Sequence, residues 1–229
     1  MAPFGKIWSY MPSPRVSKVQ NQLKIANLSG LELEISQGFV LHKDNQTEEY
    51  LSKFPLGKVP GFEGADGTRL VESDAIAQYV AESGPLADQL LGATPLERAS
   101  IRSWISFSDH AFLRVIRELV MWRFGKWEYD GERETTQLAL LERGLAYMEG
   151  HLPGRTWLGE NGRLSLGDIT VAAPLHVGFM VIIDAEMRAK YPLVTSWFER
   201  VMAVEGVGKA MGEITFIEKR QVYEAKADA

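Results

Sequence analysis

The sequence predicts an α/β domain at residues 1–84 followed by an all-α domain at residues 94–229. Two observations indicate this fold class. Short segments with strand and helix patterns alternate up to about residue 84, whereas nearly every later segment has the spacing of a helix. Glycine and proline interrupt regular structure, and Gly84-Pro85 begins the expected connection. A chain of 229 residues is long enough for two small domains.

The first elements predict a β-α-β unit. Residues 6–10 (Lys-Ile-Trp-Ser-Tyr) are rich in strand-forming residues. Ser13 is a favoured N-cap and Pro14 suits the first helical position, so a helix is expected from there to just before Gly30. Apolar and polar residues alternate over 31–35, which indicates a second strand. A helical crossover between the two strands favours parallel pairing.

The rest of the first domain completes the order β-α-β-α-β-β-α. A polar stretch at 42–49 precedes a short strand at 58–62. The Asp-Gly pair at 66–67 is a strong hairpin signal, and a return strand is expected at 69–72. Ser73 is then expected to cap a helix.

The second domain is predicted to be entirely helical, with helices at 94–124, 132–149 and 165–183 and from 191. Thr94 and Glu97 have the spacing of a capping box. Ser165 and Asp168 form a similar cap, which makes Asp168 a structural residue. The apolar stretch at 169–183 is shorter than the roughly 18 residues that a membrane span needs, so it predicts a buried central helix.

Composition argues against several functions. The chain has 30 acidic and 25 basic residues and a net charge of −5, which argues against a general nucleic-acid binder. It contains no cysteine, which excludes a disulfide scaffold, a zinc–thiolate site and a cysteine nucleophile. The four histidines lack metal-ligand spacing, so no bound metal is expected. No segment has the pattern of a signal peptide or a membrane span, so a soluble cytoplasmic protein is expected.

Four local patterns, in this order along the chain, make the sequence similar to the cytosolic glutathione S-transferases. They are Ser13-Pro14-Arg15-Val16, His42-Lys43 followed by residues 54–60 (Phe-Pro-Leu-Gly-Lys-Val-Pro), residues 72–76 (Glu-Ser-Asp-Ala-Ile), and residues 165–172 (Ser-Leu-Gly-Asp-Ile-Thr-Val-Ala). Each pattern alone is weak, but their order and spacing are specific and cover nearly the whole chain. The resemblance implies that the first domain is a thioredoxin-like glutathione-binding domain. It also implies that the helical domain contributes the site for the second substrate.

Two subgroups of the family look nearest. Similarity to the transferase-like domain of the gamma subunit of translation elongation factor one is carried by residues 61–67 (Gly-Phe-Glu-Gly-Ala-Asp-Gly), Tyr191-Pro192 with Trp197-Phe198, and Gly212-Glu213-Ile214 with Glu218-Lys219. Ser13 and His42-Lys43 resemble the serine-type phi class of plants and fungi. The elongation-factor subunit has a further C-terminal domain, which a chain ending at Ala229 lacks. A stand-alone enzyme, of fungal origin, is therefore expected.

The resemblance makes Ser13 the candidate catalytic residue. A transferase must lower the pKa of the glutathione thiol, which for an unperturbed cysteine is about 8.5. The Ser13 hydroxyl could donate a hydrogen bond to the sulfur, and a helix N-terminus favours an anion. The alternative is that Ser13 only caps the helix. Tyr10 and Ser9 are the other candidates, since other classes of the family use a tyrosine near this strand end.

Glu72 and Ser73 form a chemically complementary pair for the γ-glutamyl end of glutathione. Glu72 could accept from the α-ammonium group, and Ser73 with the helix N–H groups could hold the α-carboxylate. In isolation the simpler interpretation is that Ser73 caps the helix and Glu72 is solvated. The resemblance also implies that the Val59-Pro60 peptide bond is cis, so that the Val59 backbone pairs with the cysteinyl residue of glutathione as an added strand.

The remaining candidates concern the two ends of the site. His42, Lys43 and Lys58 could face the glycyl carboxylate of glutathione, or could be solvated loop charges. The hydrophobic electrophile would lie between the domains. Its expected site comprises Met11, Trp104, Phe107, Ser108 and Phe112. Aromatic residues at helical spacing more often belong to a core, and that alternative stays open here.

The function expected from the resemblance is that of a glutathione S-transferase, with glutathione as co-substrate and a hydrophobic electrophile as second substrate. Detoxification or a step in secondary metabolism would be its setting. Glutathione-dependent peroxidase or ether cleavage would use the same thiolate and is one alternative. A non-catalytic protein like elongation factor one gamma, binding other elongation-factor subunits, is another and is disfavoured. Family members are usually dimers, so a homodimer is expected, with no nucleic-acid or membrane partner.

Overall fold

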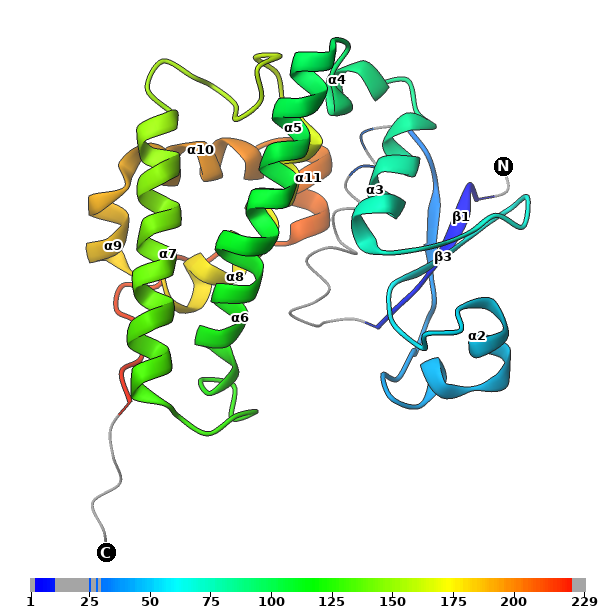
Figure 1. Ribbon diagram of the computed structural model, residues 1–229, viewed down its shortest axis with the longest axis horizontal. Helices are drawn as coiled ribbons and strands as arrows, with labels where there is room; N and C mark the ends of the chain where they lie inside the picture. The colour runs from blue at the N-terminus through cyan, green and yellow to red at the C-terminus, as the bar shows by residue number, and fades with distance from the viewer. Residues whose placement is uncertain (1–2, 11–24, 26–27, 29, 224–229) are drawn as a thin grey trace, which may run out of the picture.

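The computed structural model describes residues 3–10, 25, 28 and 30–223, and they form two lobes (Figure 1). The smaller lobe contains a sheet and the larger one is helical. The helix predicted between Ser13 and Gly30 lies outside the described residues, as do the candidate site residues Met11 and Ser13. The predicted sequence of an α/β domain and an all-α domain is confirmed.

A four-stranded mixed sheet organises the smaller lobe. Its strands are β1 (Gly5–Trp8), β2 (Leu33–Ile35), β3 (Gly61–Gly64) and β4 (Arg69–Val71), in the spatial order β2-β1-β3-β4. The predicted parallel pairing of the first two strands is confirmed, with Ile7 opposite Ile35. The other two pairs are antiparallel, and Ile7 lies opposite Phe62 across β1 and β3.

Alternation along the strands gives the sheet two different faces. Ile7 and Phe62 are buried on one face, where the Phe62 ring contacts Tyr79 of α3 (Ser73–Glu82). Trp8 lies on the opposite face, where its ring contacts Tyr50 of α2 (Glu48–Lys53). The short 3-10 helix η1 (Asp44–Gln46) precedes α2. Helices α2 and α3 therefore pack on opposite faces of the sheet.

Several predicted boundaries in this lobe differ from the observed ones, and two of the differences, at the third strand and at helix α3, lie beside the candidate site. The third strand begins at Gly61 rather than at residue 58, and the preceding Pro60 has no N–H to donate to a strand ladder. Helix α3 includes Ser73 as its first residue, so its N-cap is Glu72 and not Ser73. The Glu72 side chain makes no capping hydrogen bond. Both differences lie where the chain enters the candidate site.

The larger lobe is built from helices. They are α4 (Ala87–Leu91), α5 (Pro95–Phe107), the π-helix η2 (Ser108–Leu113), α6 (Arg114–Met121), α7 (Gly131–His151), α8 (Leu166–Val181), α9 (Ala185–Lys190), α10 (Pro192–Met202) and α11 (Glu205–Met211). The single helix predicted at 94–124 is observed as three consecutive helical segments, α5, η2 and α6, of which the middle one is π-helical. Both capping boxes are confirmed, at Thr94 with Glu97 and at Ser165 with Asp168.

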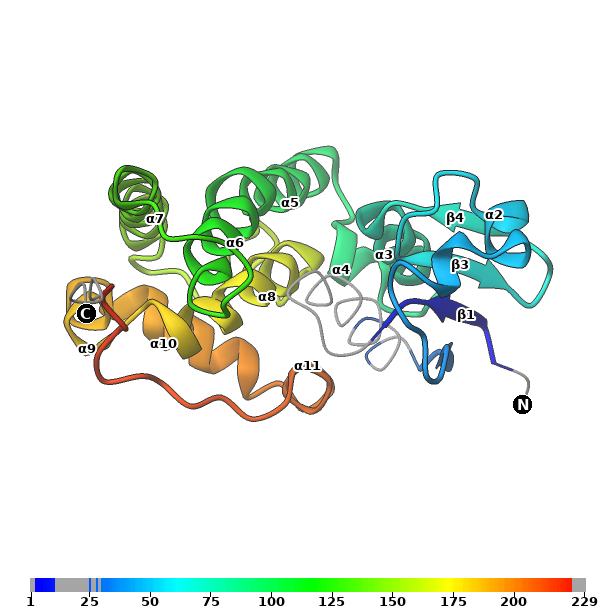
Figure 2. The ribbon, with the colours of Figure 1, turned by 90° about the horizontal axis from the view of Figure 1, so that it is seen from below.

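Helix α8 is the centre of this lobe, and its residues from Leu166 to Leu175 are all buried (Figure 2). The carboxylate of Asp168 holds its start in place. Oδ1 accepts hydrogen bonds from the Leu158 backbone N–H at 2.8 Å and from the Trp197 indole at 2.9 Å, and Oδ2 accepts from the N–H and the hydroxyl of Ser165. Burial raises the pKa of Asp168, while these four hydrogen bonds act in the opposite direction.

Two further features complete the arrangement. The side chain of Gln89 in α4 donates to the Leu164 carbonyl at 3.2 Å, which ties the connection between the lobes to the start of α8. None of the described helices has both the length and the hydropathy that crossing a bilayer requires.

Replacing Asp168 with asparagine is expected to destabilise the protein. An amide offers one acceptor oxygen where the carboxylate offers two, so at least one buried donor loses its partner. We expect the free energy of unfolding to fall by about 3 kcal/mol, measured by chemical denaturation.

Asp130→Asn is the matched control, because Asp130 caps α7 at an exposed position and asparagine is an equally good N-cap. Its effect should stay within about 0.5 kcal/mol. Equal stability of Asp168→Asn and the control would contradict the role assigned to Asp168.

Candidate active site

A pocket of about 100 Å³ opens where β3, β4 and α3 meet. It is lined by Phe54, Leu56, Lys58, Val59, Pro60, Val71, Glu72 and Ser73. Four of these, Lys58, Val59, Glu72 and Ser73, are glutathione-binding candidates from the sequence. The structure therefore brings together an ammonium group, a strand-like backbone segment, a carboxylate and a hydroxyl at a helix N-terminus.

The Val59-Pro60 peptide bond on one wall of this pocket is cis, as the resemblance implied. Val59 is outside the ladder of β3, which begins at Gly61. The Val59 backbone is therefore not used by the described sheet.

Glu72 has a backbone conformation that residues with side chains rarely adopt, with φ of +66° and ψ of 119°. Its carbonyl nevertheless accepts the first hydrogen bond of α3, from the Ile76 N–H at 3.0 Å. A conformation of this kind costs about 1–3 kcal/mol and persists only where surrounding contacts impose it. Glu72 is the N-cap of α3, so it directly precedes the first turn, whose backbone N–H groups give the helix its positive end.

Asn45 and Tyr50 connect two segments that carry cationic candidates, His42-Lys43 and Lys58. We call these the two cationic segments. The buried Asn45 side chain accepts a hydrogen bond from the His42 N–H and donates one to the Gly57 carbonyl, both at 2.6 Å. The Tyr50 hydroxyl donates to the Lys58 carbonyl at 2.6 Å. Burial raises the pKa of Tyr50 to about 12, so the hydroxyl remains a donor at neutral pH.

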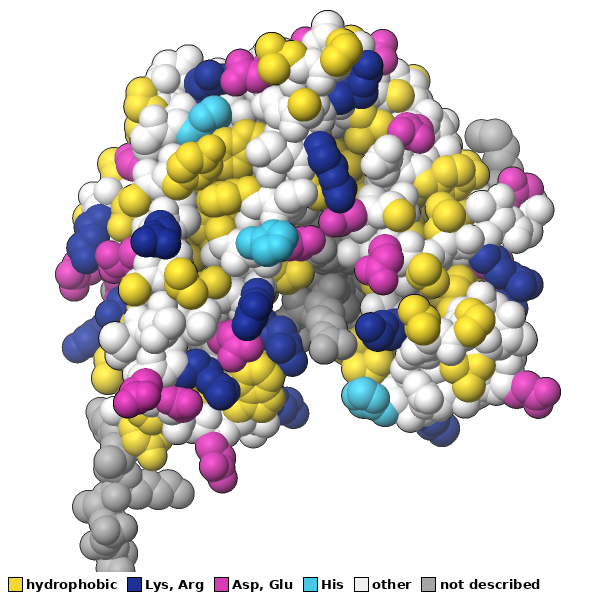
Figure 3. All heavy atoms as spheres, viewed as in Figure 1, with side chains coloured by type: hydrophobic (Ala, Val, Ile, Leu, Met, Phe, Trp, Pro, Cys, Tyr) yellow, Lys and Arg dark blue, Asp and Glu magenta, His cyan; other side chains and the backbone are white. Residues whose placement is uncertain are grey.

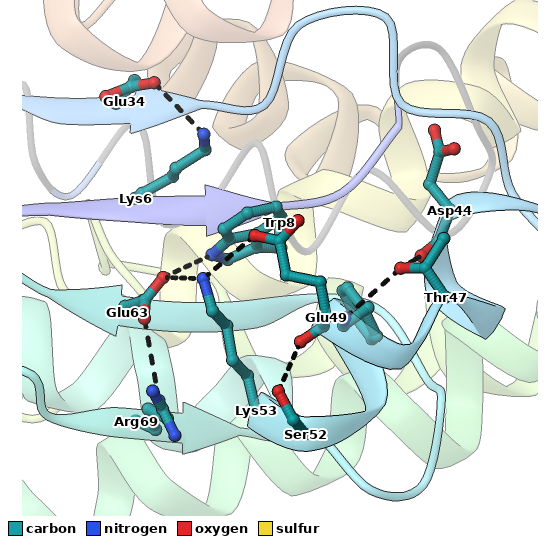
Figure 4. Close-up of polar contacts among 11 residues, drawn as sticks. Lys6, Trp8, Glu34, Asp44, Thr47, Glu49, Ser52, Lys53, Glu63 and Arg69 are labelled. Atoms are coloured by element: carbon teal, nitrogen blue, oxygen red, sulfur yellow. Dashed lines mark hydrogen bonds and ion pairs between the residues drawn. The ribbon is translucent and has the colours of Figure 1, made fainter.

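A charged network fixes α2 against the sheet (Figure 4). The ammonium of Lys53 at the end of α2 lies 3.0 Å from Glu63 Oε2, and the same oxygen accepts from the Trp8 indole at 3.2 Å. The ammonium groups of Lys6 and Lys53 each lie 4.4 Å from the centroid of the Trp8 ring. Burial alone would raise the pKa of Glu63, but these donors and Arg69 outweigh it and lower the pKa.

Sequence reasoning missed Asn45, Tyr50 and Glu63. Asn45 falls in a polar stretch that resembles a solvated loop, and no spacing in the sequence indicates that its amide is buried. Tyr50 and Glu63 belong to short elements whose partners are distant in the chain. Phe54 and Leu56, two apolar residues of the pocket, belong to the family motif at 54–60, but the sequence assigned no role in the site to either.

Of the three candidates for thiol activation, the structure describes Ser9 and Tyr10. Ser13 lies outside the described residues. Ser9 is 1% exposed, and its backbone N–H and carbonyl are both hydrogen-bonded to the Ser36 hydroxyl, at 3.1 and 2.9 Å. A buried Ser9 offers no surface for a bound thiol. Tyr10 is half-buried directly after it.

Among the described residues expected at the electrophile site, Trp104 and Phe107 contact helix α7. The Trp104 ring contacts His151 and Tyr147 of α7, and the Phe107 ring contacts Tyr147 as well. These side chains therefore face α7, on the side of α5 that packs within the helical lobe.

Phe112 and Ser108 are core residues as well. Phe112 is fully buried, and its ring lies against α7 at Gly144, where any side chain would collide with it. The buried Ser108 hydroxyl donates to the Thr170 carbonyl of α8 at 2.9 Å. The prediction that Ser108 and Phe112 line an open site is wrong, because neither has exposed surface.

No group of three or more His, Asp or Glu side chains within the described ranges is arranged to hold a metal ion.

Comparison with known proteins shows the family of this chain. Residues 3–82 match the glutathione S-transferase N-terminal domain, and residues 109–205 match its C-terminal domain. The chain belongs to the glutathione S-transferase family. It is 46% identical over 224 residues to the glutathione S-transferase-like protein LUC7 of Fusarium sp, which covers 98% of this chain and 100% of that protein.

Two solved structures illustrate the range of the family. The glutathione S-transferase-like domain of elongation factor 1-gamma from Saccharomyces cerevisiae superposes with a TM-score of 0.81 at 22% identity, covering 95% of this chain and 97% of that one. At this identity the likeness concerns the fold. The theta class enzyme of Xanthomonas axonopodis pv. citri, solved with glutathione bound, gives a TM-score of 0.77 at 25% identity, covering 93% and 100%.

The backbone of Glu72 can be tested by comparing two variants. Glu72→Ala and Glu72→Gly both remove the carboxylate, but only glycine adopts a positive φ without steric cost. We expect the glycine variant to be more stable than the alanine variant by about 1 kcal/mol in chemical denaturation, even though glycine makes the unfolded chain more flexible. An alanine variant as stable as the glycine variant would show that Glu72 is not held in this conformation.

Proposed function

We propose that this protein is a glutathione S-transferase that joins the glutathione thiolate to hydrophobic electrophiles, in detoxification or secondary metabolism. The observation that carries the proposal is the pocket that brings Lys58, Val59, Glu72 and Ser73 together. Its groups follow the order of charges along glutathione. Glu72 would receive the γ-glutamyl ammonium, and Ser73 with the first turn of α3 would receive the adjacent carboxylate.

The remainder of the peptide fits the other wall. The cysteinyl residue would pair with the Val59 backbone in the manner of an added strand. The glycyl carboxylate would then lie towards Lys58 and the His42-Lys43 segment, where cations form charge-assisted hydrogen bonds. Figure 3 supports this placement, since histidine and lysine or arginine side chains border the hollow between the lobes on the side of the smaller lobe.

Catalysis requires the bound thiol to ionise at neutral pH. We assign this step to the Ser13 hydroxyl, with Tyr10 as the alternative donor. The thiolate then attacks an electrophilic carbon of the second substrate and forms a carbon–sulfur bond. With an aromatic halide the halide departs with the electron pair of the broken bond; with an isothiocyanate the electron pair of the C=N bond moves to nitrogen, which takes up a proton. Holding both substrates in reacting geometry supplies much of the rate enhancement. We place the second substrate between the two lobes.

Two other activities are compatible with parts of the same evidence. Glutathione-dependent peroxidase or ether cleavage would begin from the same thiolate. A non-catalytic role like that of elongation factor 1-gamma is the other, since the chain is 32% identical over 223 residues to elongation factor 1-gamma of Artemia salina and spans 50% of that protein. Retention on immobilised glutathione supports the enzyme, and co-purification with elongation-factor subunits without such retention supports the binding protein. We further propose a cytoplasmic location and a division into domains at 1–84 and 94–229.

The proposed reaction can be measured with glutathione and an aromatic halide or an isothiocyanate. We expect turnover in the wild type, and in Ser13→Ala a rate profile displaced to higher pH by about one unit, since losing one hydrogen bond to the thiolate costs about 1.4 kcal/mol. Ser17→Ala, four residues away, is the control. Bound glutathione without turnover on any of several electrophiles would refute the transferase proposal. An unchanged profile in Ser13→Ala would transfer the thiol-activating role to Tyr10.

We also propose that the protein is a homodimer in which the smaller lobe of one copy contacts the helical lobe of the other. Helix α2 and strand β4 of the smaller lobe lie towards the same face as α7 of the larger one (Figures 1 and 2). Exposed apolar side chains lie on both lobes, among them Leu56 after α2, 70% exposed, and Tyr147 in α7, 58% exposed. Exposed apolar surface on both lobes is suited to association.

Size-exclusion chromatography with light scattering should therefore give twice the chain mass of 25.6 kDa. Leu56→Glu is expected to shift the protein towards the monomer, because it places a charge in an apolar contact. Leu193→Glu, at an exposed position in α10, is the control and should remain dimeric. A wild-type monomer at all concentrations would contradict the proposal.

A further inference from the structure

Two loops, one with His42-Lys43 and one with Lys58, form the proposed site for a carboxylate. Such a site requires contacts that keep the two loops at a fixed separation. In the proposed function, which this inference assumes, the glycyl carboxylate of glutathione is received by Lys58 and by the His42-Lys43 segment. Neither segment belongs to a strand or an α-helix. Their positive charges repel each other, so the separation between them must be imposed by other contacts.

Asn45 makes that connection through one side chain. Its amide oxygen accepts from the His42 N–H, and its amide nitrogen donates to the carbonyl of Gly57, the residue before Lys58. Both distances are 2.6 Å, and Asn45 is only 3% exposed. The amide nitrogen and the amide oxygen of Asn45 are thus both hydrogen-bonded, each to the backbone of a different segment. His42 has a φ of +68°, a conformation that needs such support in a residue with a side chain.

Tyr50 supports the other end of the same connection. Its hydroxyl donates to the Lys58 carbonyl at 2.6 Å, and its ring packs against Trp8, Phe39 and Phe54. Helix α2, which carries Tyr50, is capped by Thr47 at its start and ion-paired to the sheet by Lys53 at its end. These contacts hold the Lys58 backbone at a fixed position relative to the sheet.

We propose that Asn45 is a positioning residue that sets the distance between the two cationic segments and so determines the affinity for the glycyl carboxylate of glutathione. Tyr50 fixes the Lys58 side of the same arrangement. Asn45 is buried and bonded to the backbone of both segments, so we assign it a role in positioning them rather than a contact with the peptide. The recognition of glycine is thereby separable from the recognition of the γ-glutamyl end at Glu72 and Ser73.

The test compares glutathione with γ-glutamylcysteine, which has the same thiol and γ-glutamyl group but lacks glycine. Dissociation constants for both peptides are measured by calorimetry on the wild type, Asn45→Leu and Tyr50→Phe. Leucine keeps the approximate size of asparagine and adds no charge, but it removes both hydrogen bonds. Ser83→Ala is the matched control for Tyr50→Phe, since each removes one hydroxyl-to-carbonyl hydrogen bond, and Ser83 lies at the far end of α3.

We expect Asn45→Leu to weaken glutathione about tenfold and Tyr50→Phe a few-fold, with the affinity for γ-glutamylcysteine unchanged in both. Ser83→Ala should bind both peptides as the wild type does. If Asn45→Leu fails to fold, the comparison of Tyr50→Phe with Ser83→Ala decides the question.

Three outcomes would overturn the inference. Equal weakening of both peptides in the variants would make Asn45 and Tyr50 general structural residues. Equal wild-type affinity for the two peptides would mean that the cationic segments do not read the glycyl carboxylate, although a transferase active with glutathione would remain. No wild-type binding of either peptide would refute the proposed function itself.

Discussion

The buried carboxylate of Asp168 is the interaction on which the larger lobe depends. It accepts four hydrogen bonds, from the connection before α8, from the cap of α8 and from α10, so three chain segments share one anchor. Helix α8 then begins at a defined place, and its apolar surface organises the helices around it. A single asparagine or serine at this position would leave at least one buried donor unpaired, which is among the more costly defects in a core.

The anchor also reaches the connection between the two lobes. The carbonyl of Leu164, next to the capping Ser165, accepts from Gln89 in α4, and the Gln89 carbonyl accepts from the Asn161 side chain at 2.7 Å. Helix α4 follows α3 directly, and the first turn of α3 contributes Glu72 and Ser73 to the pocket. The start of α8, the connection between the lobes and the glutathione-binding candidates are consequently parts of one continuous set of contacts.

Local signals in the sequence were sufficient for much of this fold. Capping boxes act within four residues, so Thr94 and Ser165 could be identified without knowing their surroundings. The length and hydropathy of residues 169–183 likewise predicted a buried helix. The site was less accessible, because its geometry depends on contacts between distant segments. Nothing in the sequence indicates that Glu72 has a positive φ, that Asn45 spans two loops, or that Trp104 and Phe112 face α7. For such residues, composition and periodicity leave the functional and core interpretations equally open until the packing is known.

We expect the pocket beside Val59-Pro60 to receive glutathione in one orientation. The two charged ends of glutathione then lie at separate groups of residues. A crystal structure of the complex with glutathione tests this most directly. We expect the γ-glutamyl ammonium at the Glu72 carboxylate, the cysteinyl backbone paired with Val59, and the glycyl carboxylate towards Lys58 and His42. Glutathione bound in the reverse orientation, or outside this pocket, would contradict it.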